Sequence, residues 1–110
     1  MDPANLHHGI SLFNSGQFFD AHEALEDAWR AAPESEKKFL QGLIQVAVAL
    51  HHHSKGNLVG AQSLLRRAAR NLALYPGSFR GVNIGALLFD LAKWRRCLED
   101  GSSVPPLPKI

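Results

Sequence analysis

The segment from residue 36 to residue 55 is the feature that most limits what this chain can fold into. Its central part, Phe39–Leu50, is apolar on nearly every side of a helix and is interrupted only by Gln41 and Gln45. A helix that is apolar all round is buried among other elements, and a stretch this short does not span a bilayer. We therefore expect a central helix over residues 36–55, with Ser35 as its N-cap and other helices around it.

Helical periodicity also dominates the rest of the chain, and no convincing run of alternating strand residues is present. Prolines and glycines separate the helical segments. Apart from the central one, the expected helices cover residues 3–14, 17–32, 58–75 and 83–98. Residues 98–110 contain Pro105, Pro106 and Pro108, and we expect them to form an extended tail that lies across the bundle.

The chain contains an internal repeat. Similar residues recur at an offset of 40 positions: Gly16 and Gly56, Phe18 and Leu58, Ala21 and Ala61, Leu25 and Leu65, Ala28 and Ala68. Each unit is a helix, a glycine-containing turn and a second helix, which loosely resembles a tetratricopeptide-like helical hairpin. We predict an all-α fold of five helices, in which two antiparallel helical hairpins stack and a C-terminal helix and the extended proline-rich tail complete the core.

Composition limits the functional classes. The length of 110 residues suits one domain, so we take residues 1–110 as a single helical domain. The net charge of +2 is smaller than a strong nucleic-acid binder usually carries. The single cysteine, Cys97, excludes an internal disulfide and a cysteine-based zinc site. The N-terminus lacks the basic and apolar regions of a signal peptide, so we expect a cytoplasmic protein with no membrane partner.

Titratable side chains interrupt the apolar pattern of the second predicted helix. His22 and Glu26 are neighbours at i,i+4, and Phe19, Glu23 and Glu26 belong to a stripe beside the apolar one. The central helix carries a row of polar residues and three consecutive histidines, which fan around its end. Our hypothesis is that these groups meet across the hairpin, and the candidate ligand-binding residues are His22, Glu23, Glu26, Gln41, Gln45, His51 and His52.

Three interpretations of this cluster remain open. The side chains satisfy one another and nearby helix ends in a structural role, they line a pocket for a small ligand, or they hold a divalent metal with His22, Glu26 and His51 as ligands. The string H-E-x-x-E lacks the second histidine of a zinc peptidase, and no E-x-x-H pair is present for a di-iron site. No nucleophile motif or phosphate-binding loop is present either. We therefore expect no enzyme activity and no cofactor, with a divalent metal as the alternative.

A second group of candidate residues is basic. Arg66, Arg67 and Arg70 lie on the fourth predicted helix, and Arg95 and Arg96 lie on the fifth. Such a surface suits nucleic acid or an acidic protein, whereas the simpler interpretation is a solvated face. The aromatic residues of the fifth helix, Phe89 and Trp94, are expected to be core or hairpin-edge residues rather than platforms for stacked bases.

Three strings carry a family resemblance: F-N-S-G-Q-F-F-D-A-H-E-A-L-E-D-A-W, F-L-Q-G-L-I-Q-V-A-V-A-L-H-H-H and G-N-L-V-G-A-Q-S-L-L. They are similar to the domain of unknown function 309 family, over about residues 6–75 and again at the closing P-P-L-P-K-I. The resemblance implies a small all-helical bundle, found mainly in prokaryotes, and no particular reaction. Its characteristic positions are Asn14, Gly16, His22, Glu23, Glu26, Trp29, Gln41, Gly42, Gln45 and His51.

The residues and the resemblance together predict a module that interacts with a protein, a peptide or another ligand. A metal- or small-molecule-binding protein that uses the histidine and glutamate cluster, and that could be an enzyme with Glu23 or Glu26 as general acid or base, is one alternative. Weak nucleic-acid binding through the arginines is the other.

Overall fold

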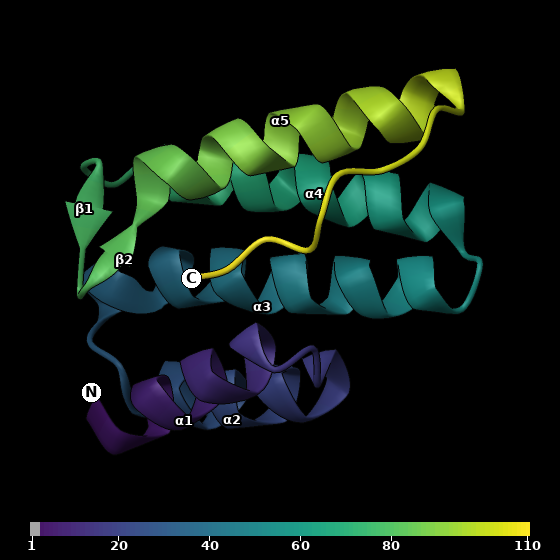
Figure 1. Ribbon diagram of the computed structural model, residues 1–110. Helices are drawn as coiled ribbons and strands as arrows, with labels where there is room; N and C mark the ends of the chain where they lie inside the picture. The colour runs from purple at the N-terminus through teal and green to yellow at the C-terminus, as the bar shows by residue number, and fades with distance from the viewer. Residues whose placement is uncertain (1–2) are drawn as a thin grey trace.

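The computed structural model describes residues 3–110 and consists mainly of α-helices (Figure 1). The helices are α1 (Pro3–Asn14), α2 (Phe18–Ala31), α3 (Glu34–Ser54), α4 (Leu58–Leu72) and α5 (Ile84–Asp100). Between α4 and α5, β1 (Ser78–Phe79) and β2 (Val82–Asn83) pair in an antiparallel hairpin. The prediction of an all-α bundle with five helices is confirmed.

The central position of α3 is visible in Figure 1, where α3 lies between the α1–α2 pair and the α4–α5 pair. The apolar residues of α3 face in several directions and are buried: Phe39, Leu40, Leu43, Val46, Ala47, Ala49 and Leu50. They belong to one hydrophobic cluster that contains residues from every helix. The all-round apolar pattern of this segment therefore predicted its place in the fold correctly, because such a helix is stable only when neighbours cover each side.

Several element boundaries differ from the prediction. α3 begins at Glu34, with Pro33 in the N-cap position, so Ser35 is inside the helix and is not its cap. α4 ends at Leu72 rather than at residue 75. α5 continues to Asp100 and ends at Gly101, whose φ of 73° is the left-handed conformation that commonly follows a helix. The extended tail therefore begins after residue 100 and not at residue 98.

The small β-hairpin was not predicted. Its strands have two residues each, which is too short for an alternating pattern to show in the sequence. The turn between them contains Arg80 and Gly81, with φ of 50° and 78°. Two successive residues with positive φ match a type I′ turn, which suits a tight two-residue hairpin. The Arg-Gly pair was the only local signal, and arginine is an uncommon residue at such a position.

The internal repeat appears in the structure as two equivalent turns. Gly16 and Gly56 both have φ of 80°. In each turn, the amide that follows the glycine donates to the carbonyl five residues earlier at 2.9 Å, and the amide of the glycine itself donates to the carbonyl three residues earlier at 3.0 Å. These bonds satisfy carbonyl groups that the end of a helix leaves unpaired. The offset of 40 positions thus corresponds to the same hairpin turn, built twice.

We expect Gly16→Ala and Gly56→Ala each to lower the free energy of unfolding by about 1 kcal/mol, because a Cβ disfavours positive φ. A Cβ at either position would meet nothing within 4 Å, so the cost is conformational and should be nearly equal. Gly77→Ala is the matched control, since Gly77 also has open space but no positive φ. Urea denaturation measures all three. Unequal losses at the two turns, or a loss at Gly77 as large as theirs, would contradict the equivalence.

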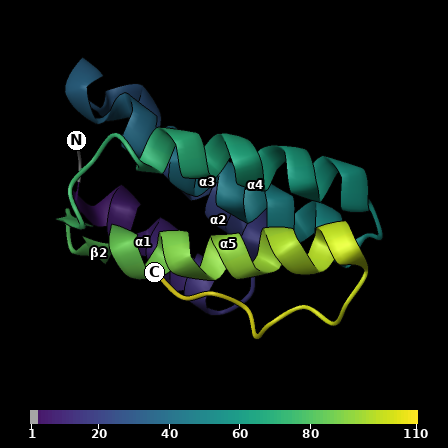
Figure 2. The same cartoon turned by 90° about the horizontal axis from the view of Figure 1, so that it is seen from above.

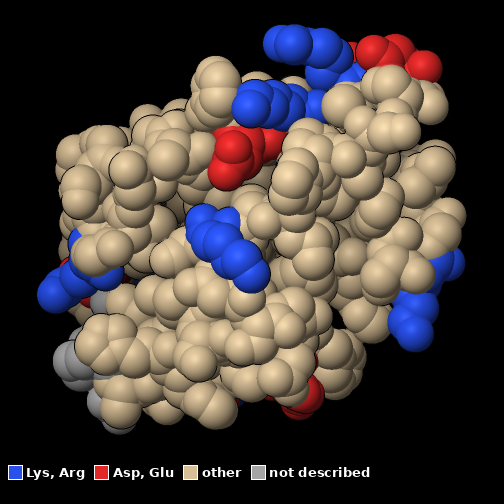
Figure 3. Space-filling view, in the orientation of Figure 1, with Lys and Arg blue, Asp and Glu red and all other residues tan. Residues whose placement is uncertain are grey.

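The proline-rich tail runs from the end of α5 towards α1 (Figures 1 and 2). The Trp94 indole Nε1 donates to the carbonyl oxygen of Pro106 at 3.2 Å, and the amide of Ile110 donates to Asn14 Oδ1 at 2.8 Å. Trp94 is buried, as expected, whereas Phe89 is 64% exposed and so is not a core residue. The face that the tail crosses carries few charged side chains (Figure 3).

Among residues 3–110, no helix is both long and apolar enough to cross a membrane.

Candidate functional site

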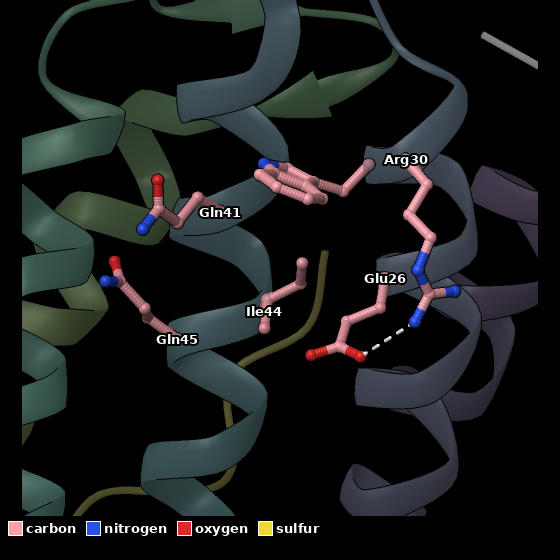
Figure 4. A pocket seen from close by; sticks show the side chains of 6 residues that line it. Glu26, Arg30, Gln41, Ile44 and Gln45 are labelled. Carbon is pink, nitrogen blue, oxygen red and sulfur yellow. Dashed lines mark ion pairs between the residues drawn. The ribbon is translucent and has the colours of Figure 1, made fainter.

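A cavity of about 390 Å3 lies between α2 and α3. One wall comes from α2 and the other from α3. In Figure 4, Glu26 and Ile44 lie between the two helices, whereas the amide groups of Gln41 and Gln45 point away from α2. The lining residues are Glu26, Trp29, Arg30, Gln41, Ile44 and Gln45. Three of them, Glu26, Gln41 and Gln45, are candidate residues from the sequence.

A second cavity, of about 210 Å3, lies between the same two helices and is more apolar. Its lining residues are Phe18, Phe19, His22, Val48, His51 and His52. The cavities adjoin each other along the helices: their nearby lining residues Ile44 and Val48 are i,i+4 neighbours on α3, and His22 and Glu26 are i,i+4 neighbours on α2. We call the two cavities together the α2–α3 groove.

The sequence positions these side chains through the faces of the two helices. On α2, Ala21, Leu25 and Ala28 are buried and determine which side of the helix faces the core. His22 and Glu26 each follow one of these positions and are therefore turned by about 100° from the buried face, towards the edge next to α3. The two side chains are therefore half-buried: that of His22 is 25% exposed and that of Glu26 is 39% exposed.

A short chain of polar contacts runs along the α2 side of the groove. His22 Nε2 lies 3.0 Å from Glu26 Oε1. Arg30 Nη2 is 3.5 Å from the other carboxylate oxygen of Glu26, while Arg30 Nη1 is only 2.6 Å from Asp27 Oδ1. Pairs this exposed stabilise a fold by less than about 1 kcal/mol. The cluster is only partly buried, so its polar groups remain accessible from solvent.

On the α3 side of the groove, one of the lining side chains is fixed by a contact with α4. Gln45 Oε1 accepts a hydrogen bond from Asn71 Nδ2 of α4 at 2.9 Å, which ties this amide to the neighbouring hairpin. Gln41, one turn earlier, is exposed. The three consecutive histidines diverge as expected: His51 and His52 line the smaller cavity, whereas the His53 ring packs edge-on against Trp94 with 5.0 Å between centroids.

Two parts of the sequence hypothesis are not realised in this arrangement. Glu23 is exposed and lines neither cavity, because its position on α2 lies further round the helix from α3 than that of Glu26. The proposed metal ligands His22, Glu26 and His51 also do not converge. Within the described part of the chain, no three histidine, cysteine, aspartate or glutamate side chains are grouped closely enough to hold a metal ion.

Phe19 lines the groove although it was not among the candidate binding residues. Its ring is 54% exposed and contacts His22 and His51, with centroid distances of 5.8 and 5.7 Å. Phe19 thus connects the histidine of α2 with that of α3. A signal was present, since adjacent residues on a helix point about 100° apart and Phe18 and Phe19 do not share one face. Phe19 lies in the stripe with the glutamates of α2, and an aromatic side chain there is expected to be partly exposed.

The basic candidates lie on a different part of the molecule. Arg66, Arg67 and Arg70 of α4 are exposed, as is Arg96 of α5, and Arg95 is half-buried. In residues 3–110 none of these five forms an ion pair. The pKa of Asp100 is lowered, first by hydrogen bonds from the Ser102 side chain and backbone and also by the positive charge of Arg96. A solvated basic face has these properties, and nucleic-acid binding stays a hypothesis.

Comparison with known proteins gives the family. The sequence matches the domain of unknown function (DUF309) over residues 6–64, which include every residue that lines the α2–α3 groove. The chain belongs to the DUF309 family. The matched region is somewhat shorter than the stretch that resembled this family in sequence, which extended to about residue 75.

Two bacterial relatives are described only as uncharacterized proteins. The one from Aquifex aeolicus (strain VF5) is 38% identical over 76 residues, which cover 68% of this chain and 23% of the relative. The protein YpuF from Bacillus subtilis (strain 168) is 41% identical over 64 residues, which cover 57% of this chain and 37% of the relative. The matched part therefore makes up well under half of either relative.

Proposed function

We propose that this chain is a docking module whose α2–α3 groove binds an amphipathic helical segment of a partner protein. The observation that carries the proposal is the pair of cavities arranged end to end between α2 and α3. Six of the seven candidate residues line them. A protein whose polar cluster served only to complete the core would bury that cluster, whereas here it borders open space.

The dimensions of the groove suit a helix. Its lining residues extend over residues 18–30 of α2 and 41–52 of α3, which is about 17 Å at 1.5 Å per residue. A partner helix of three turns has this length and places apolar side chains at i, i+4 and i+7 on one face. Such a helix would cover Phe19, whose ring is 54% exposed. Removing that apolar surface from water favours docking.

The groove also has the mixed character of a binding surface. Phe19, Ile44 and Val48 supply apolar contact, and the exposed Gln41 and half-exposed Glu26 supply polar groups at the edge. Protein interfaces commonly combine an apolar centre with a polar rim. The matched region is also a minor part of its two bacterial relatives, as expected for a module that works beside other segments.

A designed peptide tests the proposal. The probe is a fluorescein-labelled, alanine-based peptide of about 16 residues, long enough for partial helicity, with leucines at i, i+4 and i+7. We expect saturable binding by fluorescence anisotropy, and amide chemical-shift changes confined to α2 and α3. Phe19→Ala should weaken binding about tenfold or more, because truncation of a central aromatic residue commonly costs over 1.4 kcal/mol.

The matched control is Phe89→Ala, since Phe89 is a similarly exposed phenylalanine on α5 and lies outside the groove. This variant should bind the peptide like the wild type. Equal binding of a peptide with the same leucines in scrambled order would contradict the proposal, as would equal losses for the two phenylalanine variants. Shift changes away from α2 and α3 would contradict it as well.

A further inference from the structure

The proline-rich tail contacts the helices at a surface that is separate from the α2–α3 groove. This surface surrounds Trp94 of α5 and Asn14 of α1, and we call it the tail site. We infer that the tail site binds an extended P-x-x-P segment of a partner protein, and that the chain's own tail occupies it in this structure. The tail shows which chemistry the site accepts, so the inference does not depend on the proposed function.

The burial pattern of the tail has the spacing of a P-x-x-P ligand. Pro108 is buried and Pro105 is half-buried, whereas Pro106 and Leu107 between them are exposed. The backbone here is neither helix nor strand, and it bends at Pro106. Proline-recognising surfaces bind prolines with this spacing, because a proline-rich chain is already extended and loses little conformational freedom on binding. The tail therefore contacts the protein through the two prolines that such a ligand uses.

Trp94 supplies the hydrogen-bond donor that recognises the backbone of the tail. Its indole Nε1 donates to the carbonyl oxygen of Pro106 at 3.2 Å, and its side chain is only 1% exposed. Proline has no amide N–H to offer, but its carbonyl remains a strong acceptor. A buried indole N–H needs a partner. Departure of the tail leaves this donor unpaired, which favours binding of another carbonyl at the same place.

Asn14 supplies two acceptors at the end of α1, of which it is the last residue. Its backbone carbonyl accepts from Lys109 Nζ at 2.6 Å, and its Oδ1 accepts from the amide of Ile110 at 2.8 Å. A helix end has unpaired carbonyls and a partial negative charge, so it favours a cation. The first contact selects a lysine directly after the second proline, while the second contact is made by backbone. The expected partner sequence is therefore P-x-x-P-K.

The tail is attached loosely enough to be replaced. Leu107 is 46% exposed, and Lys109 and residues 101–103 are exposed as well. A segment with few buried contacts opens at a low cost in free energy. The tail of a second copy would make the same contacts and would also lose the freedom of a separate molecule. A segment from a different protein, which adds contacts of its own, is therefore the better occupant.

Full-length chains with altered tails test the inference. Pro105→Ser/Pro108→Ser removes both of the prolines that contact the protein, whereas Pro106→Ser, the matched control, removes the exposed proline and keeps its carbonyl. The probe is a fluorescein-labelled peptide with the sequence of residues 101–110, and anisotropy measures its binding. We expect it to bind the double variant at least about tenfold more tightly than the wild type, because a tethered competitor acts at a high effective concentration. Pro106→Ser should resemble the wild type.

Two further measurements locate the bound peptide. In the double variant, Trp94→Phe should weaken binding about fivefold, which is the effect of one hydrogen bond, and Phe19→Ala in the α2–α3 groove should leave it unchanged. The other measurement uses the wild type and so does not require that the double variant folds. Excess peptide should displace the tail and accelerate hydrogen exchange at the amide of Ile110, whereas a peptide with serine in place of both prolines should not.

Each contrary result overturns the inference. Equal affinity of the peptide for the wild type and the double variant, or unchanged exchange at Ile110, would show that the tail is only a structural strap. Weaker binding after Phe19→Ala but not after Trp94→Phe would place the peptide in the α2–α3 groove, which would support the proposed function instead. A wild-type dimer in sedimentation that the double variant does not form would identify the tail of a second copy as the occupant.

Discussion

Replacing Arg80 by alanine is expected to lower the free energy of unfolding by about 3 kcal/mol. The reason is Glu36, a carboxylate near the start of α3 that is only 6% exposed. Its Oε1 accepts hydrogen bonds from Arg80 Nε, at 2.7 Å, and from Arg80 Nη2, while its buried Oε2 has no hydrogen-bond partner among the residues described. Loss of one partner leaves a buried charge uncompensated, which costs about 3–5 kcal/mol. Because Arg80 is 52% exposed, the lower end of that range applies.

Two further variants separate the ion pair from the backbone of the turn. Arg80 has φ of 50°, so Arg80→Gly loses the same side chain but should be about 1 kcal/mol more stable than Arg80→Ala. In the double variant Arg80→Ala/Glu36→Leu the buried charge is gone as well, and most of the lost stability should return. Urea denaturation measures the free energy of unfolding of the wild type and of each variant. If the double variant is no more stable than Arg80→Ala, the uncompensated charge is not the cause.

Trp94→Ala is expected to have the largest effect, a loss of about 3–5 kcal/mol in the free energy of unfolding, as for other buried tryptophans. The Trp94 side chain is 1% exposed, packs against His53 and donates to the carbonyl of Pro106. Its removal therefore opens a cavity in the core and also releases the tail. Thermal or urea unfolding measures the first effect. Faster hydrogen exchange at the amide of Ile110, which donates to Asn14, measures the second.

Trp94→Phe distinguishes these two roles. A phenylalanine keeps most of the aromatic packing but lacks the indole N–H, so we expect a smaller loss of about 1 kcal/mol from the hydrogen bond together with a modest packing term. The tail amides should still exchange faster than in the wild type. An unchanged exchange rate at Ile110 in both variants would show that the tail is held independently of Trp94.

The elements of the fold were predictable because they depend on residues close together in the sequence. The apolar pattern over Phe39–Leu50 identified the central helix, and the recurrence of Gly16 at Gly56 identified two equivalent turns. Failures occurred where the local signal was short or misleading. Ser35 is a favourable capping residue, yet Pro33 starts the helix two residues earlier, and the two-residue strands near Arg80 have no periodicity to detect.

The candidate site was predictable only in part. Helical geometry correctly grouped His22 with Glu26 and predicted that the three consecutive histidines diverge. It also placed Glu23 in the group, although Glu23 lines neither cavity, and it left Phe19, which contacts His22 and His51, out of the candidate residues. Neighbouring residues of α2 point about 100° apart, so one can face the groove while the next faces solvent. Sequence periodicity does not resolve that rotation for residues at the edge of the apolar face.

The sequence by itself determined that residues 3–110 form five helices, where each of them begins and ends to within a few residues, and that one of them must be central. Periodicity and turn residues act over a few neighbouring positions, so the sequence contains this information. Tertiary structure alone decided what surrounds the polar cluster. Whether Glu26, Gln41 and Phe19 border a cavity or fill a core depends on how closely α2 and α3 approach, and that distance is set by the packing of side chains from distant parts of the chain. The two cavities between these helices are the result of that packing.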